Sequence, residues 1–368
     1  MILVAYILLL IVIMYATWLL IISFYWNKSK NNFIVYNNIP VSIIIPFRNE
    51  EQNLKACIDS ILNQNYDASV IEIILVDDHS SDKSIEIASS LANIKLLQLP
   101  ENVIGKKNAI TYGIQHASHE IIITRDADTT CSTTWLQLMM SNQKQYAADM
   151  VIGQVMLKND FSFLAAIQIL EQHALTVITG GTANMKKPIL CNAANLLFTK
   201  TIFNRVNGFT GNDFIASGDD VFLLNKIIDL KTSTVTYLKN SSAAVMCDTE
   251  KSFSKMIQQR IRWASKNKHN NNVINAFTAV LVISANISWV IFGFLSLFYN
   301  ELTSYFLITA ILKCLIDFLL LFLASSFYKQ TKLLWWFPLF FCVYPVELIA
   351  IMFLTLPGKI KWKDRIIQ

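Results

Sequence analysis

Long apolar segments lie at both ends of the 368-residue chain, and the charged residues are concentrated between them. Residues 1–26 contain no Asp, Glu, Lys or Arg, and further apolar runs cover residues 273–299, 302–324 and 333–356. A helix needs about 20 apolar residues to cross a bilayer. The pattern predicts an N-terminal transmembrane anchor at residues 1–26 and a C-terminal membrane region of about three segments at residues 273–357.

The charges around the first segment indicate an uncleaved anchor. No basic residue precedes the apolar run, as one would in a signal peptide, whereas Lys28 and Lys30 follow it. By the positive-inside rule, the middle of the chain is then cytoplasmic.

The tail at residues 358–368 is basic, and the same rule favours a cytoplasmic position for it. Three full crossings after the middle of the chain would place the tail outside. The run at residues 333–356, which contains Pro338 and Pro345, is therefore the best candidate for an interfacial or re-entrant segment.

Three charged residues interrupt the C-terminal apolar runs. Lys313 and Asp317 are four residues apart, so they can pair on one face of a helix, and Glu347 lies in the next run. Charges at membrane depth usually face protein or a water-filled cavity. Two interpretations stay open: a path for a lipid acceptor, or a polar clamp between helices.

Short β-branched runs alternate with helical stretches in the middle of the chain, residues 38–266. Continuous apolar runs of this kind are typical of buried parallel strands, and the alternation predicts an α/β fold with a doubly wound, Rossmann-like sheet. The predicted strands are residues 41–46, 71–76, 94–99 and 121–124, and the predicted helices are residues 51–63, 82–92 and 106–116.

Polar side chains follow each predicted strand, at the sheet edge where such folds bind ligands. Asp77 and Asp78 follow the second strand, Lys106 follows the third, and Asp126 and Asp128 follow the fourth. Two carboxylates one residue apart suit Mg²⁺ or Mn²⁺, which would bridge a substrate diphosphate. The alternative is that an aspartate here caps the next helix.

Composition narrows the function classes. Only 15% of the residues are charged and the net charge is +5, most of it near the C-terminus, which argues against nucleic acid as the main partner. The six cysteines are scattered without C-x-x-C, so neither a zinc site nor a disulfide framework is expected. There is no G-x-G-x-x-G, Walker A or G-x-S-x-G motif, so a dehydrogenase, a P-loop NTPase and an α/β-hydrolase are disfavoured.

Two later motifs have two interpretations each. Asp219 and Asp220, in S-G-D-D at residues 217–220, supply either a general base or a helix cap. Arg260 and Arg262, within Q-R-I-R-W at residues 259–263, either bind phosphate or form a basic stripe at the membrane surface.

Together these elements resemble the membrane-anchored family 2 glycosyltransferases, which are inverting enzymes of GT-A fold. The resemblance covers about residues 40–265. It rests on SIIIPFRNEE, LVDDHSSD, GKKNAI, the D-A-D at 126–128, the G-D-D at 218–220 and the Q-x-x-R-W at 259–263.

The resemblance implies a role for each motif. Pro46, Arg48 and Glu50 would line the nucleotide pocket, Asp78 with Asp77 would contact the base, and Lys106 would lie near the diphosphate. Asp126 and Asp128 would be the DxD pair that holds Mg²⁺ or Mn²⁺, with Asp128 the better ligand. Asp220 would be the general base, with Asp219 and Trp263 at the acceptor site. Gln259 and Arg262, with Arg260 beside them, would hold the diphosphate. Two positions depart from the family: Asp219, where Glu is common, and His79, where Gly is common.

The expected reaction is transfer of a sugar from a nucleotide sugar, with UDP the expected nucleotide, to a hydroxyl of a membrane-associated acceptor. A lipid or glycolipid acceptor is favoured, because polymer synthases of this kind generally carry more membrane helices. A processive polysaccharide synthase and an inactive membrane scaffold are the alternatives. The expected location is the inner membrane of a bacterium, with the catalytic domain cytoplasmic.

Overall fold

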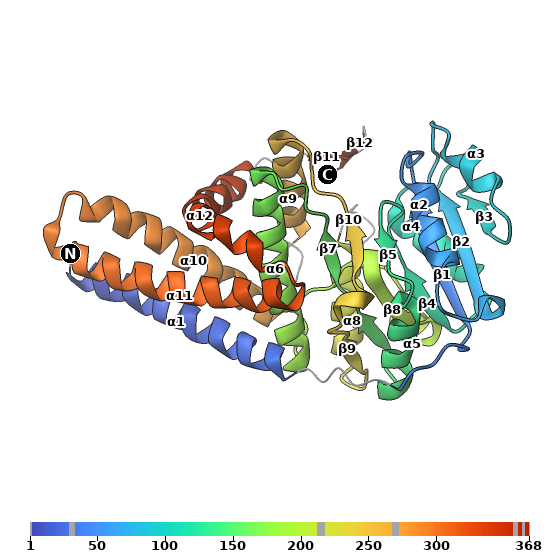
Figure 1. Ribbon diagram of the computed structural model, residues 1–368, viewed down its shortest axis with the longest axis horizontal. Helices are drawn as coiled ribbons and strands as arrows, with labels where there is room; N and C mark the ends of the chain where they lie inside the picture. Colours follow the sequence, from blue (N-terminus) through green and yellow to red (C-terminus); the bar gives the residue numbers. More distant parts are fainter. Residues whose placement is uncertain are drawn as a thin grey trace. The chain divides into compact units, whose positions relative to one another are not determined.

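The computed structural model describes residues 2–28, 34–211, 218–266, 272–355, 360–362 and 365–367. The chain forms two compact units (Figure 1). The helical unit comprises residues 1–28, 159–187 and 250–367, and the sheet unit comprises residues 29–158 and 188–249. Each unit is therefore built from segments far apart in the sequence.

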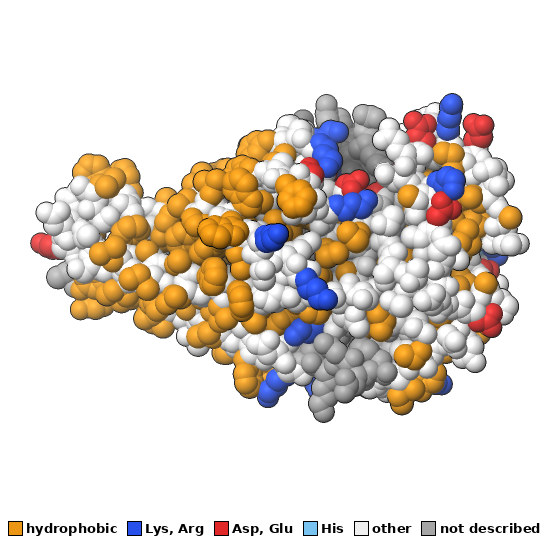
Figure 2. All heavy atoms as spheres, viewed as in Figure 1, with side chains coloured by type: hydrophobic (Ala, Val, Ile, Leu, Met, Phe, Trp, Pro, Cys, Tyr) orange, Lys and Arg blue, Asp and Glu red, His pale blue; other side chains and the backbone are white. Residues whose placement is uncertain are grey.

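The helical unit contains the long apolar helices. They are α1 (Ile2–Asn27), α6 (Phe163–Asn184), α10 (Val273–Ser296), α11 (Thr303–Phe327) and α12 (Phe337–Leu354). In the described part of the chain, five stretches are long and apolar enough to cross a membrane, and they correspond to these five helices. Apolar side chains gather over the helices in Figure 2. The unit is completed by α9 (Phe253–Lys266), by 3-10 turns at Asn300–Leu302 and Thr331–Trp336, and by β11 (Ile360–Trp362) paired with β12 (Arg365–Ile367).

Helix α6 is an apolar helix that the sequence pattern did not single out. It lies within the stretch predicted as one soluble domain, residues 38–266, but it packs against α1 and α11 in the helical unit. The contact with α1 is close, because a Cβ at Gly181 would lie 2.5 Å from the carbonyl oxygen of Ile22. The two compact units thus divide the chain differently from the predicted boundaries.

The charged residues of α11 form a clamp between helices. Lys313 Nζ lies 2.5 Å from Asp317 Oδ2, as the spacing predicted, and the hydroxyl of Tyr15 in α1 donates to Asp317 Oδ1 at 2.5 Å. Lys313 is 1% exposed. These contacts favour the clamp over a lipid path for this pair.

The sheet unit is built on a seven-stranded sheet of order β3-β2-β1-β4-β8-β6-β9. Its first four strands in the chain are parallel and match the predicted strands within two residues: β1 (Val41–Phe47), β2 (Ile71–Asp77), β3 (Lys95–Gln98) and β4 (Ile121–Thr124). The sheet as a whole is mixed rather than all-parallel, because β8 (Leu196–Thr199) runs antiparallel to β4 and to β6 (Met150–Ile152). Strand β9 (Val235–Tyr237) is parallel to β6.

A three-stranded sheet begins two residues after Asp128. It has the order β5-β10-β7, formed by Thr130–Cys131, Val245–Cys247 and Val155–Leu157. The helices of the unit are α2 (Leu54–Leu62), α3 (Ser84–Ser89), α4 (Lys106–Gln115), α5 (Trp135–Tyr146), α7 (Lys200–Arg205) and α8 (Asp219–Asp229), with 3-10 turns η1 (Ala68–Val70), η2 (Ala193–Asn195) and η3 (Ser241–Ala243).

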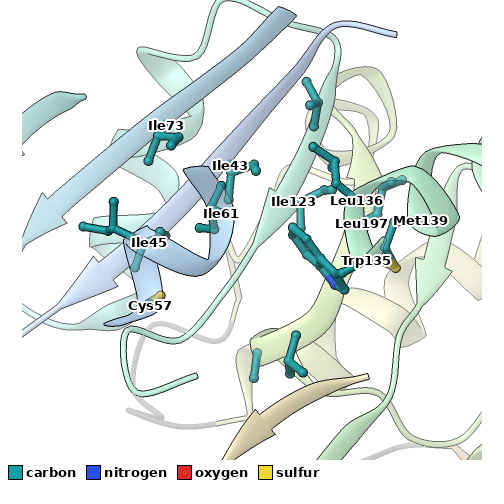
Figure 3. Packing of buried hydrophobic residues seen from close by; sticks show 14 of the residues in the cluster. Ile43, Ile45, Cys57, Ile61, Ile73, Ile123, Trp135, Leu136, Met139 and Leu197 are labelled. Carbon is teal, nitrogen blue, oxygen red and sulfur yellow. The ribbon is translucent and has the colours of Figure 1, made fainter. Parts of the chain in front are cut away.

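The apolar strands are buried because both faces of the sheet are covered. On one face, Ile43, Ile45 and Ile73 pack with α2, and Trp135 of α5 lies beside Leu197 (Figure 3). On the other face α4 approaches β1 closely, since a Cβ at Gly113 would meet Ile44 at 2.7 Å. This packing fixes the carboxyl ends of the strands, where the polar residues lie.

Candidate active site

The loops that follow β1 and β2 are braced against each other. Arg48 Nη1 donates to the carbonyl oxygens of Asp78 (2.8 Å) and His79 (2.9 Å), and the amide of Glu50 donates to Ser84 Oγ at 2.7 Å. His79 has a φ of +56°, a left-handed conformation that explains why glycine would also fit there. Arg48 thus holds the acidic loop through its backbone.

Pro46 lies inside β1 rather than in the turn after it. It is buried and pairs in register with Val76 of β2. The pairing of β1 with β4 ends at Ile44 and Thr124, so the missing N–H of the proline falls beyond that ladder. Its role in a nucleotide pocket stays a prediction.

Asp77 and Asp78 are both buried, at 3% and 2% exposure. Asp77 Oδ1 accepts from the amide of Ser80 at 3.0 Å, which shapes the turn after β2. Asp78 Oδ1 accepts from the amide of Gly105 at 3.0 Å, directly before α4. Asp78 therefore ties the end of β2 to the helix that carries Lys106.

Lys106 brings three of the sequence motifs together. Its Nζ lies 2.6 Å from Asp126 Oδ1, and its side chain is 28% exposed. Burial alone would lower the pKa of Lys106, but the charges of Asp126, Asp219 and Asp220 outweigh it and raise the pKa above its usual value. Lys106 is thus a permanent cation among acids from β4 and α8.

Asp126 and Asp128 form an acid pair at the end of β4. The surrounding protein and the like charges of Asp126 and Glu50 raise the pKa of Asp128 to about 6, although its side chain still reaches solvent. In the part of the chain that the structure describes, no lysine or arginine forms an ion pair with Asp128. Neither acid caps a helix, because α5 begins at Trp135 with Thr134 as its cap residue.

Crowded carboxylates fit a divalent cation, which relieves their mutual repulsion. Among the described residues, no three His, Cys, Asp or Glu side chains gather closely enough to hold a metal by themselves. The pair therefore suits a metal that completes its coordination with phosphate oxygens and water, as Mg²⁺ often does.

Asp219 and Asp220 lie in the first turn of α8, after Gly218, which has a φ of +90°. They are 6% and 8% exposed. The amide of Ala193 in η2 donates to Asp220 Oδ2 at 3.2 Å, and this contact was not foreseen from the sequence. Since Gly218 is the cap residue, neither acid is the helix cap, and Asp220 is held by a segment next to β8.

The Q-x-x-R-W motif lies on α9 of the helical unit. Gln259 Nε2 donates to Glu250 Oε1 at 3.2 Å, and burial lowers the pKa of Arg262, with Glu250 opposing that change. Arg260 is 3% exposed, forms an ion pair with Glu171 of α6, and stacks on the ring of Trp263 at 4.7 Å. The prediction that Arg260 binds the donor is therefore replaced by a structural role, because its guanidinium is buried against a carboxylate.

The sequence motifs did not identify two buried residues that hold the surroundings of the site in place. Arg125, at the end of β4, is fully buried under the D-A-D turn, and its only sequence signal is a lone arginine after an apolar run. Asn195 is 0% exposed and bonds to Trp135, Gln154 and Ala243. No periodicity or motif marks such a residue.

Comparison with known proteins indicates the class of protein to which this fold belongs. Residues 42–205 match the family model described as Glycosyl transferase family 2. The glycosyltransferase AglE of Haloferax volcanii is 24% identical over 226 residues, covering 60% of this chain and 71% of that protein. An undecaprenyl-phosphate 4-deoxy-4-formamido-L-arabinose transferase of Yersinia pestis is 42% identical over 99 residues, which are 24% of this chain and only 28% of the relative.

A solved structure shares the fold. The mannosyltransferase PcManGT from Pyrobaculum calidifontis, in complex with GDP-Man and Mn²⁺, has a TM-score of 0.56 over 95% of this chain and 99% of its own, at 16% identity. The fold and the matched region define the class of the protein as a glycosyltransferase with a GT-A-like α/β sheet and long apolar helices. Within that class, residues 42–205 match glycosyl transferase family 2.

Proposed function

We propose that this enzyme transfers a sugar from a nucleoside diphosphate sugar to a hydroxyl of a lipid acceptor, with inversion at the anomeric carbon. The observation that carries the proposal is the cluster around Lys106, where one cation lies among Asp126, Asp219 and Asp220. A transferase of this kind needs a cation for the leaving diphosphate and a carboxylate for the incoming hydroxyl, and the cluster offers both.

The loops after β1 and β2 are assigned to the nucleotide. Asp77 and Asp78 are proposed to contact the base, within the frame that Arg48 and Glu50 hold. UDP is the proposed nucleotide. The structural neighbour was solved with GDP-Man, so guanosine donors belong in the same test.

Asp126 and Asp128 are the residues that would hold Mg²⁺ or Mn²⁺. Their crowding with Glu50 fits such an ion, as argued above. When bound, the ion supplies positive charge that stabilises the departing diphosphate. Lys106 contributes a second, permanent positive charge at the same edge of the sheet.

Asp220 is proposed as the general base. The carboxylate takes the proton of the acceptor hydroxyl, the hydroxyl oxygen forms a bond to the anomeric carbon, and the bond from that carbon to the diphosphate oxygen breaks. Attack from the face opposite the leaving group inverts the anomeric centre. The hydrogen bond from the amide of Ala193 to Oδ2 orients the carboxylate for this step.

The residues on α9 complete the proposal. Gln259 and Arg262 are assigned to the diphosphate and Trp263 to the acceptor, with Asp219 beside the base. These assignments rest on the resemblance of the Q-x-x-R-W motif alone. Arg260 is left out of them, because it pairs with Glu171.

A lipid acceptor is favoured by the five helices that are long and apolar enough to cross a membrane. A relative that matches over 99 residues is named for undecaprenyl phosphate, which supports the same choice. We propose an integral membrane protein with the sheet unit in the cytoplasm of a bacterium. A processive polysaccharide synthase is the second candidate, because it would use the same site chemistry.

The test is sugar transfer by the purified full-length protein with Mn²⁺, membrane lipids and a panel of UDP- and GDP-sugars, with products identified by mass spectrometry. We expect Asp220→Asn and Asp128→Ala to lose at least about 100-fold in rate, the lower end of general-base effects. Asp229→Asn, at the exposed far end of the same helix, is the matched control and should transfer normally.

The outcomes separate the candidates. One sugar added to a lipid supports the proposal, whereas long product ladders favour the polysaccharide synthase. Transfer by Asp220→Asn near the wild-type rate would contradict the base assignment. An absence of turnover with every donor would favour an inactive scaffold.

A further inference from the structure

Arg125 is a buried cation directly before the acid pair. It follows β4, its amide donates to the carbonyl oxygen of Ile44 at 3.0 Å, and its side chain is 0% exposed. The next residue is Asp126, so Arg125 directly precedes the turn that presents both acids.

The guanidinium forms hydrogen bonds to that turn at several points. Nη2 donates to the carbonyl oxygen of Thr129 at 3.0 Å and to its Oγ1 at 3.1 Å, and Nη1 lies 2.9 Å from Cys131 Sγ. The group also stacks on the ring of Trp135, 4.8 Å from the ring centre. A planar fork with fixed donor directions can make such a set of contacts, and a lysine cannot.

Thr129 connects Arg125 to the backbone of the D-A-D turn. Its amide donates to the carbonyl oxygen of Asp126 at 3.2 Å, and its hydroxyl donates to the same oxygen at 2.7 Å. Arg125 therefore fixes Thr129, and Thr129 fixes the backbone between the two acids. Cys57 Sγ, 3.7 Å from the same carbonyl oxygen, closes the turn from α2.

Packing alone does not account for a charged group at this position. Within the described residues no carboxylate forms an ion pair with Arg125, and its Nε has no hydrogen-bond partner. A buried charge without a counter-charge is costly, and an apolar side chain would usually serve a core better. What Arg125 provides, and an apolar side chain would not, is a set of N–H donors whose directions match the acceptors of the turn.

We propose that Arg125 is a positioning residue for the divalent-cation site: it fixes, through Thr129, the turn that holds Asp126 and Asp128 in place before the donor binds. The inference rests on the metal site of the proposed function. It concerns affinity for the cation, and it assigns Arg125 no contact with substrate.

The sign of the effect distinguishes positioning from simple charge. Removing a positive charge near a cation site would strengthen cation binding if only the field mattered. Loosening the turn would weaken it. Arg125→Met does both, and Arg125→Lys keeps the charge while losing the fork, so positioning predicts weaker binding in both variants.

The experiment titrates Mn²⁺ into the full-length protein and follows free Mn²⁺ by electron paramagnetic resonance. We expect both Arg125 variants to bind Mn²⁺ at least about tenfold more weakly, the scale of effects from residues that orient metal ligands. Asp128→Ala reports the loss of the site itself. Binding by Arg125→Met that equals or exceeds that of the wild type would overturn the inference.

A milder pair guards against variants that fail to fold. Thr129→Val removes the hydroxyl that bonds to Asp126 and keeps the volume, whereas Thr129→Ser keeps the hydroxyl. Positioning predicts weaker Mn²⁺ binding for the valine variant, near-normal binding for the serine variant, and recovery of most of the turnover at saturating Mn²⁺ in both. Equal Mn²⁺ affinity in the two would count against it. If the wild type and Asp128→Ala bind Mn²⁺ alike, the metal site of the proposed function has failed instead.

Discussion

Asn195 is a small side chain whose loss should strongly lower the free energy of unfolding of the sheet unit. It is 0% exposed, its Oδ1 accepts from Trp135 Nε1 at 2.9 Å, and its Nδ2 donates to the carbonyl oxygens of Gln154 at 2.8 Å and Ala243 at 2.9 Å. One side chain thus joins α5, the link between β6 and β7, and η3. Asn195→Ala removes all three hydrogen bonds at once.

The magnitude follows from what each partner retains. The carbonyl oxygen of Gln154 still accepts from the amide of Val245 at 3.0 Å, so it keeps one partner. The indole N–H of Trp135 and the carbonyl oxygen of Ala243 lose the bonds described above. At about 1–3 kcal/mol for each buried group left unsatisfied, we expect Asn195→Ala to lower the free energy of unfolding by about 4 kcal/mol. For a domain of about 150–250 residues this corresponds to a fall of about 8–16 °C in Tm.

The assay is thermal unfolding of the full-length protein in detergent, followed by tryptophan fluorescence at one scan rate, because unfolding of such proteins is often irreversible. Asn142→Ala is the matched control. Asn142 is 2% exposed but accepts one hydrogen bond, from the half-buried Thr236 hydroxyl at 2.6 Å. That hydroxyl can turn to water, so the control should cost only about 1 kcal/mol.

A second variant separates hydrogen bonding from the cavity. Asn195→Asp keeps the volume but points an acceptor at two carbonyl oxygens, so it should be at least as unstable as the alanine variant. Because Asn195 ends the η2 segment whose Ala193 amide bonds to Asp220, both variants should also lower turnover at temperatures where they stay folded. Equal Tm shifts for Asn195→Ala and Asn142→Ala would refute the reasoning.

Three further predictions follow from the structure. Burial lowers the pKa of Lys239 to about 8, whereas the pKa of an unfolded lysine is about 10.4. The unfolded chain therefore binds more protons between those values, and the free energy of unfolding should rise with pH from about 8 to 10. Lys239→Gln should flatten the corresponding rise in Tm, and an unchanged slope would contradict the assignment. Lys313→Met leaves Asp317 without its cation and should cost about 3 kcal/mol in thermal unfolding, with partial recovery in the double variant Lys313→Met, Asp317→Leu; a double variant no more stable than the single one would speak against a coupled pair. A green fluorescent protein fused to the C-terminus should fluoresce in cells, as expected for a cytoplasmic tail, and a dark, membrane-inserted fusion would place the tail outside.

The parallel half of the sheet could be predicted because its signal is local. Strands buried on both faces are continuous apolar runs, such as Ile43 to Ile45, and the observed bounds of β1 to β4 differ from the predicted ones by no more than two residues. The polar clusters at their ends were found for the same reason. Strands β6 and β9 have only three residues each, and β8 pairs antiparallel with partners on either side, so their placement depends on distant segments.

Side chains with two plausible uses were the harder case. Arg260 and Arg262 look equivalent in the sequence, yet Arg260 is buried against Glu171, a residue of another helix. Burial of an arginine depends on whether a distant carboxylate lies opposite, and spacing along the chain does not contain that information. Arg125 was missed for a different reason: its partners lie in the turn that follows it, and no motif marks an arginine that bonds to its own turn.

The sheet also constrains how helix α6 can meet a membrane. Strands β4 and β6 precede α6 in the chain and β8 follows it, yet β8 pairs with both in one sheet. We therefore expect both ends of α6 on the same side of a bilayer, and we infer that this 22-residue helix does not cross it, although its length and composition would allow it to. An apolar helix with both ends on one side lies at the membrane surface or against other helices, and α6 packs on α1 and α11.

The same reasoning bears on the C-terminal tail. Helix α9 begins four residues after Thr249, so we infer that it starts on the same side of a bilayer as that residue, and its 14 residues are too few to cross one. The backbone of β11 contacts α9, which puts the end of the chain on that side too. We then expect an even number of the helices α10, α11 and α12 to cross. Helix α12, with Pro345 in its interior and Glu347 buried, is the one we infer to turn back, and the basic tail then agrees with the positive-inside rule.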